Sequence, residues 1–380
     1  MRRALLAVAV LAVALSAPVR VSDAASRQAA NGPELDAAAW YLVGEDGTVL
    51  AQRNSRRARA VASITKLMTA LVAVEHARLS DVVRVSPLAA GVGGSTIFLR
   101  GGEELTVGTL VRGALVPSAN DAATALAIHV GNGSISQFVS LMNEKAATLG
   151  LRDTTYTNPH GLDQAGHVSS ARDTTVLLEY ALTKPFLRNA LSRSTFSLAP
   201  GRTFETTDDL LGWPALIGGK TGHTGDAGWS EAAAAAGRGT TVYGTVLGGA
   251  TREARNAALQ KLLRYGIARY RRIAAIDSTR VYAEVETGYG RPAVELVAPR
   301  TLRRTVLATK PLVEGVVAPS SVELPVRKGQ RLGRVQVWDR DELVAESRLV
   351  AAEEVTEPGL LGKAKWFVER TAANLWGIFT

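Results

Sequence analysis

The sequence contains no cysteine, which excludes disulfide bonds, thiolate catalysis and cysteine-ligated metal sites. Most of the basic residues are arginine and lysine is scarce, so a lysine within a motif is harder to attribute to chance. Of the 380 residues, 46% are hydrophobic and 21% are charged. That composition is typical of a globular protein, and the length is sufficient for two domains.

The chain also lacks the usual signatures of nucleic-acid-binding proteins. Its net charge of +9 suits nucleic acid, an anionic membrane surface or an acidic polymer equally well. No helix-turn-helix, zinc finger or run of interleaved aromatic and basic residues is present, so we predict no nucleic-acid partner. The five histidines form no H-E-x-x-H pattern, so we predict no metal and no cofactor.

No hydrophobic run is long enough for a comfortable membrane span. Met1-Arg2-Arg3 precedes an apolar run that ends at Ala17, and small residues follow at Ser22-Asp23-Ala24. This pattern predicts a signal peptide over residues 1–25, with a retained N-terminal anchor as the alternative. With either interpretation, we expect the protein to act outside the cytoplasm.

Residues 26–274 alternate between strand-like and helix-like patterns. Hairpins are predicted over 41–50 and over 229–247, where Gly237-Arg238-Gly239 separates two strand-length segments. Helical spacing predicts helices over 63–75, 122–130, 135–149 and 253–271, and a capping box of Ser170 and Asp173 predicts another through Leu182. The predicted fold class is α+β, with helices packed around an antiparallel sheet.

Two further segments follow this domain. Residues 275–356 carry short alternating runs separated by Pro and Gly, which predicts a small all-β domain. Over residues 357–380, helical spacing gathers the apolar side chains into one arc flanked by Lys363, Lys365 and Arg370, with Trp366 on the polar side. This pattern predicts an amphipathic helix on a membrane surface. A terminal helix docked on its own protein is the alternative.

Ser63-Ile64-Thr65-Lys66 is an S-x-x-K motif at the start of a predicted helix. Serine is a weak nucleophile at neutral pH and requires a base within hydrogen-bond reach. Residues three apart share one helix face, so the Lys66 amine is expected beside the Ser63 hydroxyl. A lysine acts as a base only when neutral, and burial or a second cation such as Lys220 would lower its pKa.

Two more motifs follow in order. Ser118-Ala119-Asn120 is S-x-N, where a second hydroxyl can pass a proton to a departing amine and Asn120 can bind a peptide amide. An N-cap role for Ser118 or Asn120 is the plainer alternative. Lys220-Thr221-Gly222 is K-T-G on a predicted strand edge with little bulk, suited to a peptide substrate. Lys220 and Thr221 can hold a terminal carboxylate, and the amide of His223 can stabilise an oxyanion.

The three motifs together resemble those of serine β-lactamases and penicillin-binding proteins. The resemblance extends to the low-molecular-mass D-alanyl-D-alanine carboxypeptidases, the penicillin-binding protein 5 and 6 group. It is carried by residues 62–69, 118–122, 158–162, 169–173 and 220–224, and by the two appended segments.

The resemblance implies a transpeptidase-like catalytic domain with Ser63 as the acylated nucleophile and Lys66 as the base. It also implies proton relay and substrate binding by Ser118 and Asn120, and a substrate strand that carries Lys220, Thr221, Gly222 and His223. One departure is the segment Thr206–Leu211, where such enzymes often have an Asn-Arg-Asn-like stretch.

We therefore expect a serine-type carboxypeptidase that removes the terminal D-alanine from peptidoglycan stem peptides and binds β-lactams covalently. It would act in the periplasm or cell-wall space, bound peripherally to the outer face of the cytoplasmic membrane. The alternatives are a β-lactamase, an endopeptidase, a non-catalytic wall-binding protein and a metallopeptidase. No Glu-x-x-x-Asn arrangement suited to a fast deacylating water lies between Ser118 and Lys220, which disfavours the β-lactamase.

Overall fold

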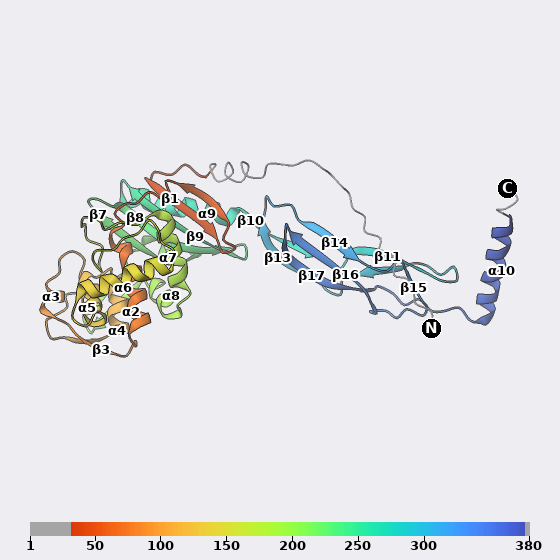
Figure 1. The fold of residues 1–380 in the computed structure, drawn as a ribbon, viewed down its shortest axis with the longest axis horizontal. Coiled ribbons are helices and arrows are strands. Elements are labelled where there is room, and N and C mark those ends of the chain that lie inside the picture. The colour runs from red at the N-terminus through yellow and green to blue at the C-terminus, as the bar shows by residue number, and fades with distance from the viewer. Residues whose placement is uncertain (1–31, 377–380) are drawn as a thin grey trace.

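The computed structural model describes residues 32–376. It forms an elongated molecule with a larger α+β domain at one end, a β-rich domain beyond it and a helix at the far end (Figure 1). The signal peptide predicted over residues 1–25 lies outside the described residues, as do Ile378 and Phe379 of the predicted amphipathic arc.

A five-stranded antiparallel sheet forms the centre of the larger domain. Its strands run in the order β2-β1-β9-β8-β7, so β7 lies at one edge. Both predicted hairpins are confirmed, as β1–β2 and β8–β9. The bounds are β1 Ala39–Gly44, β2 Val49–Arg53, β7 Leu216–Thr224, β8 Gly228–Gly237 and β9 Thr240–Gly249.

Helices cover both faces of this sheet, which explains the run of alanines in β8. Ala232 and Ala234 pack into a core built mainly by the helices that precede β7. Ala233 and Ala235 point to the opposite face, where Leu259 and other residues of α9 (Arg252–Ala268) cover the sheet. Because successive residues of a strand face opposite sides, a strand buried on both faces is apolar throughout.

The helix α2 (Lys66–His76) lies at the centre of the larger core, and every residue from Lys66 to Ala73 is buried. The remaining elements of this domain are further helices and two short two-stranded sheets. These are α3 Pro87–Ala90, α4 Val107–Leu115, α5 Asn120–Val130, α6 Ile135–Thr148, α7 Ala171–Leu182, α8 Pro185–Leu191, β3 Val82–Arg84, β4 Glu104–Thr106, β5 Thr195–Ala199 and β6 Arg202–Glu205. As predicted, Ser170 caps α7, and its hydroxyl accepts a hydrogen bond from the Asp173 amide at 3.1 Å.

Two predicted helix bounds are corrected. The helix expected over 63–75 begins as a short 3-10 turn, η1 (Ala62–Thr65), and becomes α-helical only at Lys66. The helix expected over 253–271 ends at Ala268, because the chain from Tyr270 onward pairs with a strand more than thirty residues later. Helical periodicity is a local pattern and carries no information about a strand partner so far along the chain.

The predicted all-β domain is confirmed, and it begins with β10 (Tyr270–Ile276), which pairs with β13 (Leu302–Leu307). Its main sheet has the order β14-β16-β17-β12-β11-β15. Val285, Leu296, Val335 and Leu349 are among its buried core residues. The bounds are β11 Val281–Thr287, β12 Val294–Val297, β14 Val313–Val317, β15 Ser321–Val322, β16 Arg331–Asp339 and β17 Glu342–Ala351.

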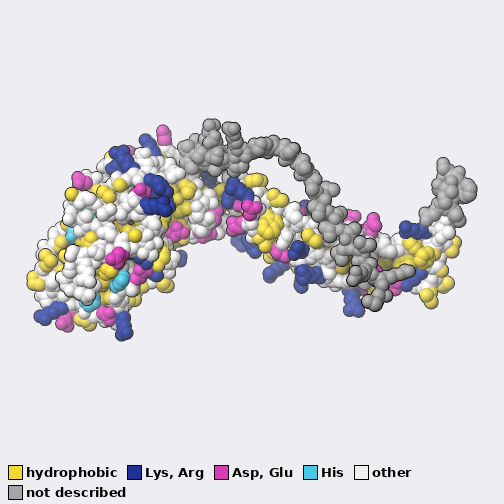
Figure 2. Space-filling view, viewed as in Figure 1, with side chains coloured by type: hydrophobic (Ala, Val, Ile, Leu, Met, Phe, Trp, Pro, Cys, Tyr) yellow, Lys and Arg dark blue, Asp and Glu magenta, His cyan; other side chains and the backbone are white. Residues whose placement is uncertain are grey.

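The predicted terminal helix is α10 (Leu360–Trp376). Trp366, which disturbs the amphipathic pattern, packs edge-on against Tyr289 of the β-rich domain with ring centroids 5.5 Å apart. The apolar residues Leu361 and Val368 remain 88% and 69% exposed. Figure 2 shows hydrophobic side chains over this end of the molecule. Among the described residues, no helix combines the length and apolar character needed to cross a bilayer.

His167 makes folding stability depend on pH. Its ring is buried, Nδ1 accepts a hydrogen bond from the Thr157 amide at 3.0 Å, and Nε2 lies 2.8 Å from the Thr65 hydroxyl. Burial lowers the pKa of His167 from 6.5 to about 4. Between pH 6.5 and pH 4, His167 is therefore protonated in the unfolded chain but not in the folded chain. The free energy of unfolding decreases as the pH falls through this range.

We predict that His167→Gln reduces the difference in unfolding free energy between pH 7 and pH 5 by about 2 kcal/mol, because the titrating ring is removed. Urea denaturation of both proteins at the two pH values measures this difference. An equal difference in the two proteins would contradict the assignment.

Candidate active site

Three segments that are far apart in the sequence meet beside the edge strand β7. They are η1 with the start of α2, the turn before α5, and β7 itself, which together bring the S-x-x-K, S-x-N and K-T-G motifs side by side. Hydrogen bonds join the side chains of Ser63 and Lys66 and those of Lys220 and Ser118.

The Lys66 amine lies directly beside the Ser63 hydroxyl. Its Nζ is 2.6 Å from Ser63 Oγ and donates a second hydrogen bond to the carbonyl of His160 at 2.8 Å. The Lys66 side chain is fully buried in α2, whereas Ser63 is only half-buried. A neutral amine can donate one N–H to the His160 carbonyl while its lone pair accepts the Ser63 hydroxyl proton.

The environment of Lys66 favours the neutral amine. Burial is the largest cause that lowers its pKa well below the usual 10.5, and the Lys220 ammonium lowers the pKa further. Asp121 opposes this effect by raising the pKa. Lys220 is also buried, and its desolvation lowers its own pKa to about 7, against the opposing charge of Asp208.

Lys220 and Ser118 form the second polar pair. Lys220 Nζ donates to Ser118 Oγ and to the carbonyl of Thr221, both at 2.9 Å. Ser118 has a φ of +66°, a left-handed conformation that costs about 1–3 kcal/mol in a non-glycine residue. The N-cap alternative for the S-x-N motif is corrected, because Ala119 occupies the N-cap of α5 without a side-chain cap and Asn120 is the first helical residue.

The remaining motif residues lie at the same site and make different contacts. Asn120 is almost fully buried, and its amide donates to the carbonyl of Gly93 at 2.7 Å. Thr221 is also buried, and its hydroxyl lies 2.6 Å from that of Thr207. The His223 ring is exposed and stacks on Trp229, with centroids 3.9 Å apart.

Gly222 allows β7 to run close to the nucleophile. A Cβ at this position would lie 2.7 Å from the carbonyl oxygen of Val61 and 3.1 Å from the Ser63 amide nitrogen. Only a glycine therefore permits this approach of the strand to η1. Since β7 is an edge strand, no other strand pairs with its outer side, which could pair with an extended peptide.

The 158–162 segment forms a rigid support below the site. The Asn158 side chain accepts from the amide of Gly161 at 2.7 Å and donates to the carbonyl of Leu162 at 3.0 Å. This turn positions the His160 carbonyl that binds Lys66. Burial is the largest cause that lowers the pKa of His160 to about 4, so its ring adds no charge near neutral pH.

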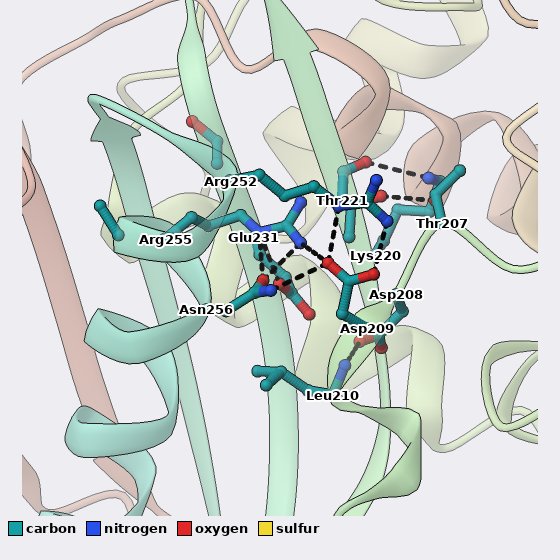
Figure 3. A network of polar contacts seen from close by, with 12 residues as sticks. Thr207, Asp208, Asp209, Leu210, Lys220, Thr221, Glu231, Arg252, Arg255 and Asn256 are labelled. Atoms are coloured by element: carbon teal, nitrogen blue, oxygen red, sulfur yellow. Dashed lines mark hydrogen bonds and ion pairs between the residues drawn. The ribbon is translucent and has the colours of Figure 1, made fainter.

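Sequence reasoning missed a buried charged cluster behind β7, which we call the Arg255 cluster and define as Asp208, Asp209, Glu231 and Arg255 (Figure 3). Asp208, Glu231 and Arg255 are almost fully buried, with exposed fractions of 5%, 0% and 1%. An acidic residue within the alanine-rich β8 strand is the one sequence signal for this cluster. Within residues 32–376, no group of three or more His, Asp or Glu side chains is placed to hold a metal ion.

Comparison with known proteins identifies two family models along the chain. A model described as D-alanyl-D-alanine carboxypeptidase matches residues 25–251. A second, described as penicillin-binding protein 5, C-terminal domain, matches residues 275–357. The two matches correspond to the α+β domain and the β-rich domain.

Similar proteins cover almost the whole chain. The D-alanyl-D-alanine carboxypeptidase DacF of Bacillus subtilis is 32% identical over 362 residues, which cover 89% of this chain and 90% of that protein. DacD of Salmonella typhimurium is 32% identical over 393 residues, which cover 98% and 99%. The crystal structure of penicillin binding protein 5 from Haemophilus influenzae superposes with a TM-score of 0.63 at 27% identity, covering 86% of this chain and 100% of that chain.

We predict that Lys220→Met raises the pKa of Lys66, because the substitution removes the second cation from the site. NMR titration of isotopically labelled lysine side chains measures the Lys66 pKa in both proteins. Lys261→Met is the control, because Lys261 lies on α9 and its amine binds the carbonyl of Glu34. A Lys66 pKa near 10.5 in the unmodified protein would contradict the lowering of this pKa by burial and by Lys220.

Proposed function

Because the chain belongs to the D-alanyl-D-alanine carboxypeptidase family of serine peptidases, we propose that Ser63 is its nucleophile and Lys66 its general base. The observation that carries this assignment is the 2.6 Å contact between the Lys66 amine and the Ser63 hydroxyl, made in a buried site that favours the neutral amine. The substrate is the terminal D-Ala-D-Ala of a peptidoglycan stem peptide.

In the first step, Ser63 Oγ attacks the carbonyl carbon of the penultimate D-alanine while Lys66 Nζ takes the serine proton. The amides of Ser63 and His223 would stabilise the oxyanion that forms, which is supported by the close approach of β7 to the Ser63 amide at Gly222. The peptide bond then breaks, and the proton that Lys66 took passes through Ser118, whose hydroxyl is bound to Lys220, to the leaving D-alanine amine, so Lys66 is neutral again.

In the second step, water attacks the ester carbonyl and Lys66 accepts a proton from that water. The ester bond breaks, Ser63 recovers its proton, and the shortened peptide leaves. Asn120 would bind the peptide amide, and Lys220, Thr221 and Gly222 would line the strand on which the substrate lies. No cofactor takes part in either step.

The same acylation accounts for covalent binding of penicillin, whose β-lactam carbonyl would occupy the position of the D-Ala-D-Ala carbonyl. The ring-opened ester would be long-lived, since the sequence between Ser118 and Lys220 has no Glu-x-x-x-Asn arrangement suited to a fast deacylating water. This argument favours a carboxypeptidase over a β-lactamase.

We predict that Ser63→Ala abolishes both D-alanine release from a pentapeptide and covalent penicillin labelling, because both reactions need the same hydroxyl. Amino-acid analysis and intact-protein mass spectrometry measure the two reactions. Ser192→Ala, at the end of α8, is a matched control that should retain both. Survival of either reaction in Ser63→Ala would refute the assignment.

We further propose that the protein acts outside the cytoplasm and binds peripherally to the outer face of the cytoplasmic membrane. The N-terminal pattern over residues 1–25 and the cell-wall substrate support export. The apolar residues Leu360, Leu361, Phe367 and Val368 of α10 support surface binding, because each is more than half exposed. Lys363 and Lys365 lie on the same helix, where they can reach lipid head groups.

We predict that deletion of residues 358–380 releases the protein from anionic lipid vesicles and leaves hydrolysis of a soluble peptide unchanged. Co-sedimentation with vesicles measures binding. Val368→Asp should weaken binding, because it places a charge in the apolar arc, while Glu369→Gln beside it should not. Equal sedimentation of the full chain and the deletion variant would contradict the membrane proposal.

A further inference from the structure

The loop that precedes β7 brings a second hydroxyl to the K-T-G strand. Thr207 Oγ1 lies 2.6 Å from Thr221 Oγ1, and the Thr207 side chain is half-buried while Thr221 is buried. The Thr207 amide also donates to the carbonyl of Val116 at 3.3 Å. The Thr207 backbone and hydroxyl are therefore both held next to the residue that the K-T-G motif offers to a substrate.

Two hydroxyls in contact use one proton for their mutual hydrogen bond and leave the second proton for another acceptor. A carboxylate is the strongest acceptor for this second proton, because a hydrogen bond from a hydroxyl to a charged acceptor is stronger than one to a neutral acceptor. The Lys220 amine, bound to the carbonyl of Thr221 at 2.9 Å, adds positive charge next to the pair. This arrangement suits a carboxylate at the outer edge of β7.

The Arg255 cluster fixes the loop from behind. Arg255 Nε contacts Glu231 Oε2 at 3.1 Å, and its Nη2 contacts Asp209 Oδ2 at 3.2 Å. Glu231 is opposite Thr221 in the β7–β8 register, so the cluster lies directly beside the K-T-G strand (Figure 3). Asp208 Oδ1 accepts from the Leu210 amide at 2.8 Å, which starts the short helix η2 (Asp209–Gly212).

Asp208 and Glu231 complete this support by sharing a proton. Among the described residues, neither Asp208 Oδ2 nor Glu231 Oε1 has a hydrogen-bond partner while both carboxyl groups are ionised, although both oxygens are buried. Burial is the largest cause that raises the pKa of Glu231 well above its usual value, followed by the Asp208 charge, so Glu231 holds the proton. A proton on Glu231 would therefore link Asp208, the residue next to Thr207, to β8.

We propose that Thr207 binds the terminal carboxylate of the substrate together with Thr221, and that the buried Asp208–Glu231–Arg255 contacts position it for this role. The inference rests on the proposed function and goes further, since it assigns carboxylate selectivity to a loop that lacks the Asn-Arg-Asn-like stretch. Thr207 is a substrate-binding residue, whereas Glu231 and Arg255 are positioning residues that act through the loop.

The test compares two thioesters of an N-acylated D-alanine that differ in one group. One has thioglycolate as its leaving group and carries a carboxylate where the terminal D-alanine carries its own. The other has thioglycolamide, which is neutral and of similar shape. The ratio of their kcat/KM values measures carboxylate selectivity apart from the acylation chemistry.

Thr207→Val should lower this ratio roughly 10- to 100-fold, because it removes one hydrogen bond to a charged group. The loss should appear with the carboxylate ester alone, and Thr207→Ser should restore the ratio. Thr203→Val is the matched control, because Thr203 lies on β6 and bonds to Ser197 instead of to the site. An unchanged ratio in Thr207→Val, or an equal loss in Thr207→Ser, would overturn the inference.

The positioning role is tested at Glu231. Glu231→Gln keeps a donor toward Asp208 and should retain the ratio, while Glu231→Ala removes the donor and should lower it. A folded Glu231→Ala variant, shown by a cooperative thermal transition, with an unchanged ratio would overturn the positioning role. Hydrolysis of neither ester by the unmodified protein would overturn the proposed function, and this inference with it.

Discussion

The chemistry of this site depends on one amine that is kept neutral beside one hydroxyl. The Lys66 amine lies 2.6 Å from Ser63 Oγ because both belong to the same turn, in which η1 leads into α2. Its neutrality comes from the position of α2 at the centre of the core, where water is excluded, and from the Lys220 ammonium nearby. In the proposed mechanism, the core of the α+β domain therefore serves catalysis as well as stability, since α2 supplies both its apolar centre and the proposed base, Lys66.

The edge strand β7 adds a second constraint, because it must approach the nucleophile closely and still present polar groups to a substrate. Gly222 permits the approach, and Lys220 and Thr221 supply the polar groups on either side of the strand. The buried charges behind β7 balance one another through Arg255, Asp209 and a proton shared by Asp208 and Glu231. In this way the strand is supported from behind by polar contacts and remains open at its outer edge.

Most of the fold and the meeting of the three motifs could be predicted from the sequence, because they follow from local patterns; the chemical roles of the motif residues stay predictions. The S-x-x-K spacing specifies one face of one turn, and the alanines of β8 indicate a strand buried on both sides. The 3-10 geometry at Ser63 and the end of α9 at Ala268 were not predictable in this way, because strand pairing and packing override helical spacing there. The Arg255 cluster was missed for a related reason. Its members lie on a loop, a strand and a helix, and no periodicity connects Asp208 to Glu231 or Arg255.

The central claim is that the serine is activated by a neutral lysine, and the pH dependence of penicillin acylation tests it most directly. The second-order rate constant for acylation of the full chain should rise with pH and level off well below pH 10, because the base works only after losing its proton. Peptide mapping by mass spectrometry should place the adduct on Ser63. A rate constant that rises only near pH 10.5, or an adduct on another residue, would contradict the account.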